Sequence, residues 1–311
     1  MSDFQKQTVQ WFPGHMAKTR RQIKESLPLV DAVTELLDAR VPLSSRNPEL
    51  NELIASKPHI VLLNKCDMAD EAATRRWKAW FGRQGSPALA VDCRSGRGLN
   101  DYGDTVRELL RDKIQSNLEK GMAGRALRMM VVGIPNTGKS SFINRMAGRS
   151  RAKVADRPGV TRQNQWFAIG GGIELLDTPG VLWPKFDDPE VGNRLAFIGS
   201  VKDEVMDVET MAVRLLAVLG AQYPARLCER YKIDREQASQ SEPYELLELI
   251  GHKRGMLMRG GEIDTERASA MLLDEYRAGR LGRIKQERLG ESGLFSMCKG
   301  NWNGRDQLVP L

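Results

Sequence analysis

The chain has few cysteines, no long apolar run and no targeting signal, and each shortage excludes a class of protein. Its 311 residues include four cysteines, none in a C-x-x-C pair: Cys66, Cys93, Cys228 and Cys298. Such spacing does not suggest a zinc site, and reduced thiols in a cytosol are the simplest interpretation. No eighteen consecutive residues are apolar, so no membrane-spanning helix is expected. The first residues lack a secretory or transit pattern, and we therefore expect a cytoplasmic protein.

The composition is that of a globular protein with an excess of positive charge. Apolar residues make up 41% of the chain and charged residues 28%, the net charge is +7 and the pI is about 9.3. This length allows two domains, and a basic balance favours polyanionic partners such as nucleic acid or a membrane surface. A merely basic soluble protein is the alternative. No basic amphipathic helix or lipidation motif is present, so no membrane partner is expected.

Apolar runs alternate with charged, helix-like stretches from about residue 30 to residue 180. This alternation predicts an α/β fold, a doubly wound and mostly parallel sheet covered by helices on both faces. The predicted strands are residues 32–37, 60–63, 88–91, 129–132, 165–169 and 173–176. The last two flank three glycines, Gly170–Gly172, which predicts an antiparallel hairpin. The charged, periodic segment 106–124 predicts a surface helix.

After about residue 205 the pattern becomes helical. Apolar residues recur at helical spacing over 208–219, and further helices are predicted at 244–250 and 266–277. No strand pattern is visible there, so the fold class is an α/β domain followed by a small all-α domain. The predicted boundaries are 1–30 for an N-terminal segment and first helix, 31–200 for the α/β domain, 205–290 for the helical domain and 291–311 for a polar tail.

A glycine-rich loop, Gly133-Ile134-Pro135-Asn136-Thr137-Gly138-Lys139-Ser140, follows one predicted strand and precedes a helical pattern. That context is the one in which backbone N–H groups wrap a β-phosphate. Lys139 would neutralise the β- and γ-phosphate oxygens, and the Ser140 hydroxyl would bind Mg²⁺. The predicted contacts are Gly133, Pro135, Asn136, Thr137, Gly138, Lys139, Ser140 and Ser141.

The base-reading motif is Asn64-Lys65-Cys66-Asp67, at the end of an apolar run. The Asp67 carboxylate can accept hydrogen bonds from guanine N1–H and N2–H₂, a donor pair that adenine lacks. Lys65 would pack over the base. Together with the phosphate loop, this motif predicts GTP and GDP as ligands.

A second base loop should follow the next strand, where Asp92-Cys93-Arg94 stands in place of the usual Ser-Ala-Lys. The backbone N–H of Cys93 would reach guanine O6, because that contact needs no side chain.

The switch residues follow the phosphate loop. Thr161 would close over Mg²⁺ and the γ-phosphate, although an ordinary loop threonine is the alternative. In Asp177-Thr178-Pro179-Gly180, Asp177 would hold Mg²⁺ through water and the Gly180 N–H would meet the γ-phosphate. Val181 stands where many GTPases place a glutamine that orients the attacking water. Catalysis must therefore recruit another group, and we predict catalytic roles for Lys139, Thr161 and Gly180.

The motif order is unusual, because the guanine-reading motif precedes the phosphate loop. Together the permuted motifs, the run Trp11–Met16 and the run Asp38–Pro48 resemble the circularly permuted P-loop GTPases of the ribosome biogenesis GTPase A family. The resemblance implies a GTPase domain and a helical RNA-binding domain that dock on an immature large ribosomal subunit, with rRNA and ribosomal proteins as partners. We expect a monomer whose GTP hydrolysis is stimulated by the subunit.

The resemblance also implies two further catalytic features. Asn136 matches a potassium ligand of related GTPases, and potassium there would act like an arginine finger, which accelerates hydrolysis roughly 10³- to 10⁵-fold. His15 matches a histidine thought to activate water. Asn136 as a turn cap and His15 as a surface histidine are the alternatives.

Two basic stretches favour RNA. One, between Arg145 and Arg162, holds six basic residues and one acid. The other runs from Lys253 to Arg288 and is interleaved with acids, so a solvated mixed surface is the alternative. Two other functions stay open: a nucleotide-gated RNA-binding scaffold with little hydrolysis, which Val181 allows, and a small-subunit assembly GTPase. Proteins that resemble the second class have an N-terminal OB-fold and a zinc-binding C-terminus. This chain has no room for the OB-fold and no Cys/His cluster for the zinc.

Overall fold

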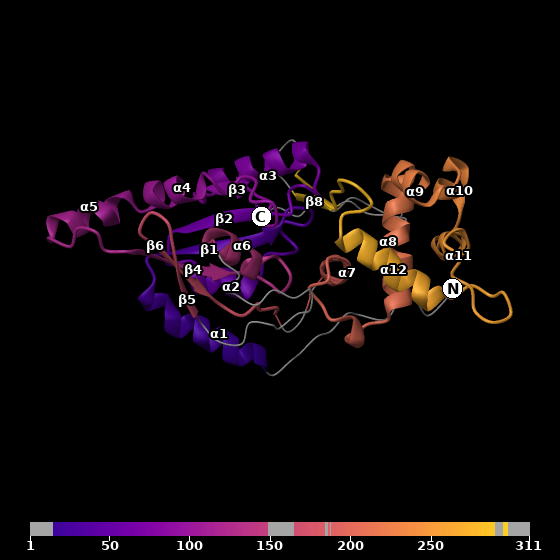
Figure 1. Ribbon diagram of the computed structural model, residues 1–311, viewed down its shortest axis with the longest axis horizontal. Helices are drawn as coiled ribbons and strands as arrows, with labels where there is room; N and C mark the ends of the chain where they lie inside the picture. Colours follow the sequence, from indigo (N-terminus) through magenta and orange to yellow (C-terminus); the bar gives the residue numbers. More distant parts are fainter. Residues whose placement is uncertain (1–14, 149–164, 184–185, 187, 290–294, 298–311) are drawn as a thin grey trace. The chain divides into compact units, whose positions relative to one another are not determined.

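The computed structural model describes residues 15–148, 165–183, 186, 188–289 and 295–297. Its chain divides into two compact units, one within Trp11–Lys185 and the other within Phe186–Leu311 (Figure 1). Among the described residues, no helix is both long enough and apolar enough to cross a membrane.

The first unit is built on a six-stranded sheet. Its strands are β1 (Ala32–Asp38), β2 (His59–Asn64), β3 (Ala88–Ala90), β4 (Leu127–Val132), β5 (Gln165–Ile169) and β6 (Ile173–Asp177), in the order β3-β2-β1-β4-β6-β5. All neighbouring pairs are parallel except the β5–β6 hairpin. The predicted doubly wound, mostly parallel sheet is therefore confirmed.

The central strands β1 and β2 are buried on both faces, which explains why they are nearly continuous apolar runs. The edge strand β5, in contrast, exposes three of its five residues. The helices are α1 (His15–Ser26), α2 (Pro48–Ile54), α3 (Glu71–Arg83), α4 (Tyr102–Leu109), α5 (Arg111–Glu119) and α6 (Lys139–Met146), and a 3-10 turn covers Leu27–Leu29. Alternate side chains of a strand point to opposite faces. Met129 thus shares a core with Tyr102 and Phe142, whereas Met130 packs with Ile23 and Leu50. Figure 1 shows α1 and α4 on opposite sides of the sheet.

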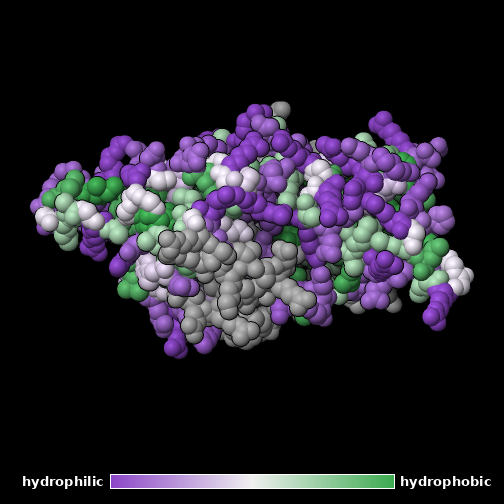
Figure 2. Space-filling model, in the orientation of Figure 1, coloured by the Kyte–Doolittle hydropathy of each residue, from purple (hydrophilic) through white to green (hydrophobic). Residues whose placement is uncertain are grey.

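The helix predicted over 106–124 is two helices. At the residue between them, Leu110, the backbone leaves helical geometry (φ −106°, ψ 20°), and its side chain is buried in the core. Beyond that anchor α5 runs into solvent, and Leu118 and Met122 at its end are exposed. Figure 2 shows hydrophobic side chains gathered in the region where Figure 1 labels α5. Packing of a single leucine thus fixes the break, which a periodic pattern does not reveal.

The second unit is mostly helical, as predicted. It contains α7 (Pro189–Phe197), a 3-10 turn at Asp203–Val205, α8 (Val208–Gln222), α9 (Pro224–Tyr231), α10 (Arg235–Gln240), α11 (Pro243–Lys253) and α12 (Thr265–Arg277). The helices expected at 208–219, 244–250 and 266–277 correspond to α8, α11 and α12. The short helices α9 and α10 were not predicted from the sequence, because few apolar positions repeat in them.

Two details of this unit differ from the sequence prediction. The helical unit begins at Phe186 rather than after residue 200, because α7 packs against α12. The Phe197 ring of α7 contacts the Tyr276 ring at a centroid distance of 6.4 Å. Arg277 Nη2 donates to the Ala196 carbonyl at 3.0 Å. A two-stranded antiparallel sheet, β7 (Glu287–Leu289) with β8 (Phe295–Met297), follows the helices, so the expectation of no strand there was wrong. The rest of the predicted polar tail lies outside the described residues.

Candidate nucleotide site

The motif loops meet at one edge of the sheet. β1 and β4 are neighbours, but the chain continues from β1 to β2 on one side, and β6 lies on the other side of β4. A crevice at such a switch point, outside the carboxyl ends of the strands, is where open α/β sheets bind ligands. The loops after β1, β2, β4 and β6 all end there.

The phosphate loop is shaped by close backbone contact. Gly133 has φ 150°, and a Cβ there would lie 2.6 Å from the Leu36 carbonyl oxygen of β1, so only glycine fits. Asn136 is left-handed, with φ 61°. The Thr137 hydroxyl donates to the Ile134 carbonyl at 3.0 Å. Gly138 is the N-cap of α6, so the helix N-terminus and the loop N–H groups converge where an anion binds.

Lys139 is buried and held by this same loop. Its Nζ donates to the Gly133 carbonyl at 3.1 Å and to the Ile134 carbonyl at 2.8 Å. Burial lowers the pKa of Lys139 to about 8, although the Asp177 carboxylate acts in the opposite direction. The amine therefore lies within the phosphate loop, and the dipoles of two carbonyl groups compensate only part of its charge.

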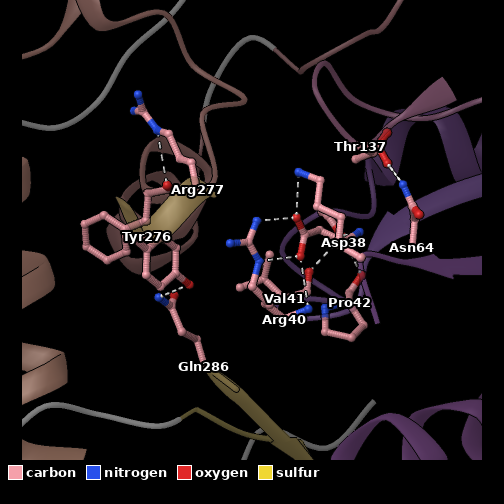
Figure 3. A network of polar contacts seen from close by, with 12 residues as sticks. Asp38, Arg40, Val41, Pro42, Asn64, Thr137, Tyr276, Arg277 and Gln286 are labelled. Carbon is pink, nitrogen blue, oxygen red and sulfur yellow. Dashed lines mark hydrogen bonds and ion pairs between the residues drawn. The ribbon is translucent and has the colours of Figure 1, made fainter. Parts of the chain in front are cut away.

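Asn64 ties the base motif to two other loops, and Figure 3 shows its bond to Thr137 of the phosphate loop. Its Nδ2 donates to the Thr137 carbonyl of the phosphate loop at 2.6 Å, and its Oδ1 accepts the Cys93 N–H at 3.0 Å. One amide thus fixes three segments that are distant in sequence. The Cys93 N–H, which we expected to reach guanine O6, is engaged by Asn64, so a contact with O6 requires this bond to be shared or exchanged.

The second base loop is closed by Asp92. Its Oδ1 accepts the Arg94 N–H at 2.8 Å and its Oδ2 accepts the Ser95 N–H at 3.3 Å. Arg145 of α6 donates to the Arg94 carbonyl. Asp92 therefore shapes the loop by bonding its own backbone, and the loop is anchored to the helix that follows the phosphate loop.

Asp67 carries the feature that fits guanine. Its Oδ1 is buried and has no hydrogen-bond partner among the residues that the structure describes. A buried acceptor without a donor is unfavourable, and the N1–H and N2–H₂ edge of a guanine would supply the missing donors. Lys65, on the same loop, is left-handed (φ 59°), and its Nζ lies 3.1 Å from Asp38 Oδ2.

The segment after β6 lies against the phosphate loop. Asp177 is buried, and the Thr178 hydroxyl donates to the Val131 carbonyl at 2.6 Å. A Cβ on Gly180 would lie 2.8 Å from Pro135 N and 2.9 Å from Lys139 Nζ. The carboxylate of Asp177 and the hydroxyl of Ser140 are the oxygen ligands that Mg²⁺ prefers beside phosphates. No group of three His, Cys, Asp or Glu side chains that could hold a metal occurs within the described ranges.

Comparison with known proteins agrees with this geometry. The chain is 46% identical over 285 residues to ribosome biogenesis GTPase A of Bacillus cereus, covering 92% of this chain and 95% of that protein. It is 32% identical over 280 residues to ribosome biogenesis GTPase A of Thermotoga maritima, covering 90% and 94%. The chain belongs to the ribosome biogenesis GTPase A family.

Two further comparisons support this membership. The family described as "50S ribosome-binding GTPase" matches residues 128–244. The crystal structure of GNP-bound YlqF from Thermotoga maritima is similar with a TM-score of 0.62 and 29% identity, covering 87% of this chain and 98% of that chain. As in other GTPases, GTP and GDP are the expected ligands, with Mg²⁺ as the usual ion.

Two predicted catalytic residues of this ribosome biogenesis GTPase A member are not placed at the site. His15 is the first residue of α1, but its side chain is outside the described part of the chain. Thr161 also lies outside the described residues. Their roles stay predictions.

Sequence reasoning assigned no role to the loop after β1, whose residues it noted only for their resemblance. In the structure Asp38 and Arg40 of this loop are both buried, with 0% and 1% exposed, and they reach the base motif through Lys65. Charged residues directly after a buried strand, at the carboxyl edge of a parallel sheet, were the signal that could have drawn attention to them.

Val181 cannot serve as the water-orienting residue in this family member. Its N–H donates to the Gly133 carbonyl at 3.3 Å, and its carbonyl accepts the Asn47 Nδ2 at 3.0 Å. Its side chain packs in the core with Val132 and Leu176. The backbone is thus held on both sides while the side chain points into the protein.

We therefore expect Val181→Gln to destabilise the protein without improving catalysis. Burying an uncompensated amide costs about 1–3 kcal/mol, so the melting temperature should fall while GTP turnover does not rise. Val205→Gln, at an exposed valine, is the control and should leave both unchanged. A Val181→Gln protein with unchanged stability and faster turnover would show that the side chain leaves the core.

The lowered pKa of Lys139 predicts a pH dependence of nucleotide binding. In the nucleotide-free protein the lysine loses its proton as the pH rises through about 8, whereas bound phosphates favour the charged amine and raise its pKa. GDP affinity should therefore be constant below pH 8 and fall above it, by up to about tenfold per pH unit.

Calorimetry in buffers of different ionisation enthalpy should show proton uptake on GDP binding near pH 8. In Lys139→Arg the guanidinium stays charged, so both the uptake and the pH dependence should disappear. Equal uptake in the arginine variant would assign the proton to another group.

Proposed function

We propose that this protein is a GTP-hydrolysing assembly factor that binds the immature large (50S) ribosomal subunit through rRNA and is released when GTP is hydrolysed. The observation that carries the GTPase part is the Asn64 amide, which joins the phosphate loop to both base loops. The 50S part is supported by the description of the matched family. We infer that the protein acts as a monomer in the cytoplasm, with rRNA and ribosomal proteins as partners.

In this proposal each motif has one task. Asp67 selects guanine, Lys139 neutralises developing charge on the β- and γ-phosphates, and the Gly180 N–H donates to the γ-phosphate. Ser140, Asp177 and Thr161 would hold Mg²⁺, which when bound supplies electrostatic stabilisation of the phosphate oxygens. Asn136 would hold K⁺, which adds positive charge at the same place.

Because Val181 is unable to orient water, the proposal assigns that task to His15. The N-terminal segment, residues 1–30, would dock on the subunit and bring the imidazole to the γ-phosphate. The large subunit would then stimulate hydrolysis by completing the site.

A cluster of arginines in the helical unit supports RNA binding. Three arginines surround the carboxylate of Glu275. The distances to its oxygens are 2.8 Å from Arg230 Nε, 3.4 Å from Arg254 Nη2 and 4.0 Å from Arg280 Nη1. Arg254 also lies over the Tyr231 ring, with its Cζ 5.3 Å from the centroid. Burial works to raise the pKa of Glu275, but the hydrogen bonds and charges around it lower it. Three cations around one carboxylate leave excess positive charge, which suits a phosphate backbone.

A single substitution tests this part. Arg280 is the most exposed of the three arginines and its contact with Glu275 is the longest. Arg280→Gln should weaken binding to large-subunit rRNA and lower the slope of log K against log salt by about 1. Arg75→Gln, at an exposed arginine of α3 that is paired with Glu71, is the control. Equal salt slopes in the Arg280→Gln and unsubstituted proteins would remove this cluster from the RNA interface.

The whole proposal is tested by GTP turnover in potassium buffer, alone and with purified large or small ribosomal subunits. We expect stimulation by large subunits only, less of it when sodium replaces potassium, and loss of it in His15→Ala with GTP affinity unchanged. Stimulation by small subunits would favour the small-subunit alternative. Tight GTP binding without stimulation would favour the second candidate, a nucleotide-gated RNA-binding scaffold, which the buried side chain of Val181 supports.

A further inference from the structure

A buried ion pair stands at the carboxyl end of β1. The Asp38 carboxylate accepts from Arg40 at three points: Oδ1 from Nε at 2.9 Å and from the backbone N–H at 3.1 Å, and Oδ2 from Nη2 at 2.7 Å. Asp38 and Arg40 are buried almost completely. A carboxylate and a guanidinium that meet through two parallel bonds are fixed in direction as well as in distance.

The same carboxylate holds a residue of the base motif. Lys65 Nζ lies 3.1 Å from Asp38 Oδ2, the oxygen that Arg40 Nη2 also approaches. The backbones are joined too, because the Ala39 N–H donates to the Asn64 carbonyl at 2.8 Å. Figure 3 shows Asp38 and Arg40 beside the strand end that carries Asn64.

The loop that carries this pair is itself fixed. The Ser45 hydroxyl accepts the Asp38 N–H at 3.0 Å and donates to the Val41 carbonyl at 2.7 Å. Burial works to raise the pKa of Asp38, but the charges of Arg40 and Lys65 hold it well below its ordinary value. The carboxylate is therefore ionised and anchored on every side, which makes it a rigid support for the lysine amine.

We infer that Asp38 and Arg40 are positioning residues for nucleotide binding, and that they hold the Lys65 side chain in the place where its stem covers the purine face. This inference rests on the proposed guanine site. A free lysine side chain samples many rotamers, and fixing them costs entropy. Asp38 holds the Lys65 amine in place before the nucleotide binds, and Arg40 holds the Asp38 carboxylate in place. The base then stacks on a stem that is already ordered.

A double-mutant cycle with GDP as the probe tests the inference. Asp38→Asn and Lys65→Met should each lower GDP affinity by about tenfold, within the range for contacting residues. The double variant should bind GDP no more weakly than Lys65→Met alone, because Asp38 acts only through Lys65. The ratio of GDP to xanthosine diphosphate affinity should stay unchanged in Asp38→Asn, since the stem touches the face of the base and not its edge.

Glu35→Gln is the matched control. Glu35 belongs to the same strand, is equally buried and is paired with Arg46 at 3.2 Å instead. This substitution should change the melting temperature but not GDP affinity. If Asp38→Asn fails to fold, Arg40→Lys takes its place in the cycle, because it keeps the charge and removes the paired bonds to Asp38.

These measurements distinguish failure of the proposed function from failure of the inference about Asp38. If the unsubstituted protein does not bind GDP, the proposed function is wrong. If it binds GDP but the two substitutions act additively, or if Glu35→Gln weakens GDP as much as Asp38→Asn does, Asp38 has only a structural role and the inference is overturned.

Discussion

Replacing Asp67 with asparagine should lower GDP affinity by about 10³-fold or more and raise affinity for xanthosine diphosphate. The reason is the buried Asp67 Oδ1, which has no donor in the described part of the protein. In the proposed site, guanine supplies that donor through N1–H and N2–H₂. An asparagine would offer its own N–H₂ to these donors, and a site left with mismatched polar groups discriminates by about 10⁴–10⁵-fold. Xanthine carries an oxygen in place of the 2-amino group, which the asparagine amide can meet.

Fluorescence titration with labelled GDP and xanthosine diphosphate measures both changes. Asp70→Asn is the control, because Asp70 is three residues away and caps α3 by accepting the Ala73 N–H at 2.8 Å. It should leave the ratio of the two affinities unchanged. An Asp67→Asn protein that still prefers GDP would show that another group reads the base edge.

Gly180→Ala should reduce GTP hydrolysis by about 10²- to 10³-fold, the effect of losing one donor to a developing oxyanion. A Cβ on Gly180 would lie 2.8 Å from Pro135 N and 2.9 Å from Pro135 Cα. These are backbone atoms of the phosphate loop, which cannot move aside as a flexible side chain does. The segment after β6 must therefore retreat, and its N–H leaves the γ-phosphate position.

Single-turnover hydrolysis and nucleotide titration distinguish this effect from simple damage. GTP affinity should fall more than GDP affinity, because only GTP carries the γ-phosphate. Gly170→Ala is the control, since a Cβ there meets no atom within 4 Å, and it should hydrolyse GTP normally. Equal losses of GTP and GDP affinity in Gly180→Ala would instead indicate that the phosphate loop itself is distorted.

The sheet was predictable because its signal is local. Strands buried on both faces, such as β1 and β4, are unbroken apolar runs, and the motifs follow them at strand ends. The glycine at 133 and the Asn-Lys-x-Asp sequence carry their chemistry in residue type and spacing, so they identify the site without coordinates.

What the sequence does not reveal depends on tertiary contacts. The break at Leu110 follows from one buried side chain, and the attachment of α7 to the helical unit follows from Phe197 and Arg277. The engagement of the Cys93 N–H by Asn64 is a contact across loops, which no pattern in either segment encodes. The burial of Arg40 is contrary to the ordinary tendency of arginine to be exposed, so only the position of its partner explains it.

Residues 38–48 touch both ends of the nucleotide position. At one end Asp38 pairs with Lys65 of the base motif. At the other end Asn47, the N-cap of α2, donates to the carbonyl of Val181, directly after Gly180. One rigid connection thus braces both the base motif and the segment that carries Gly180.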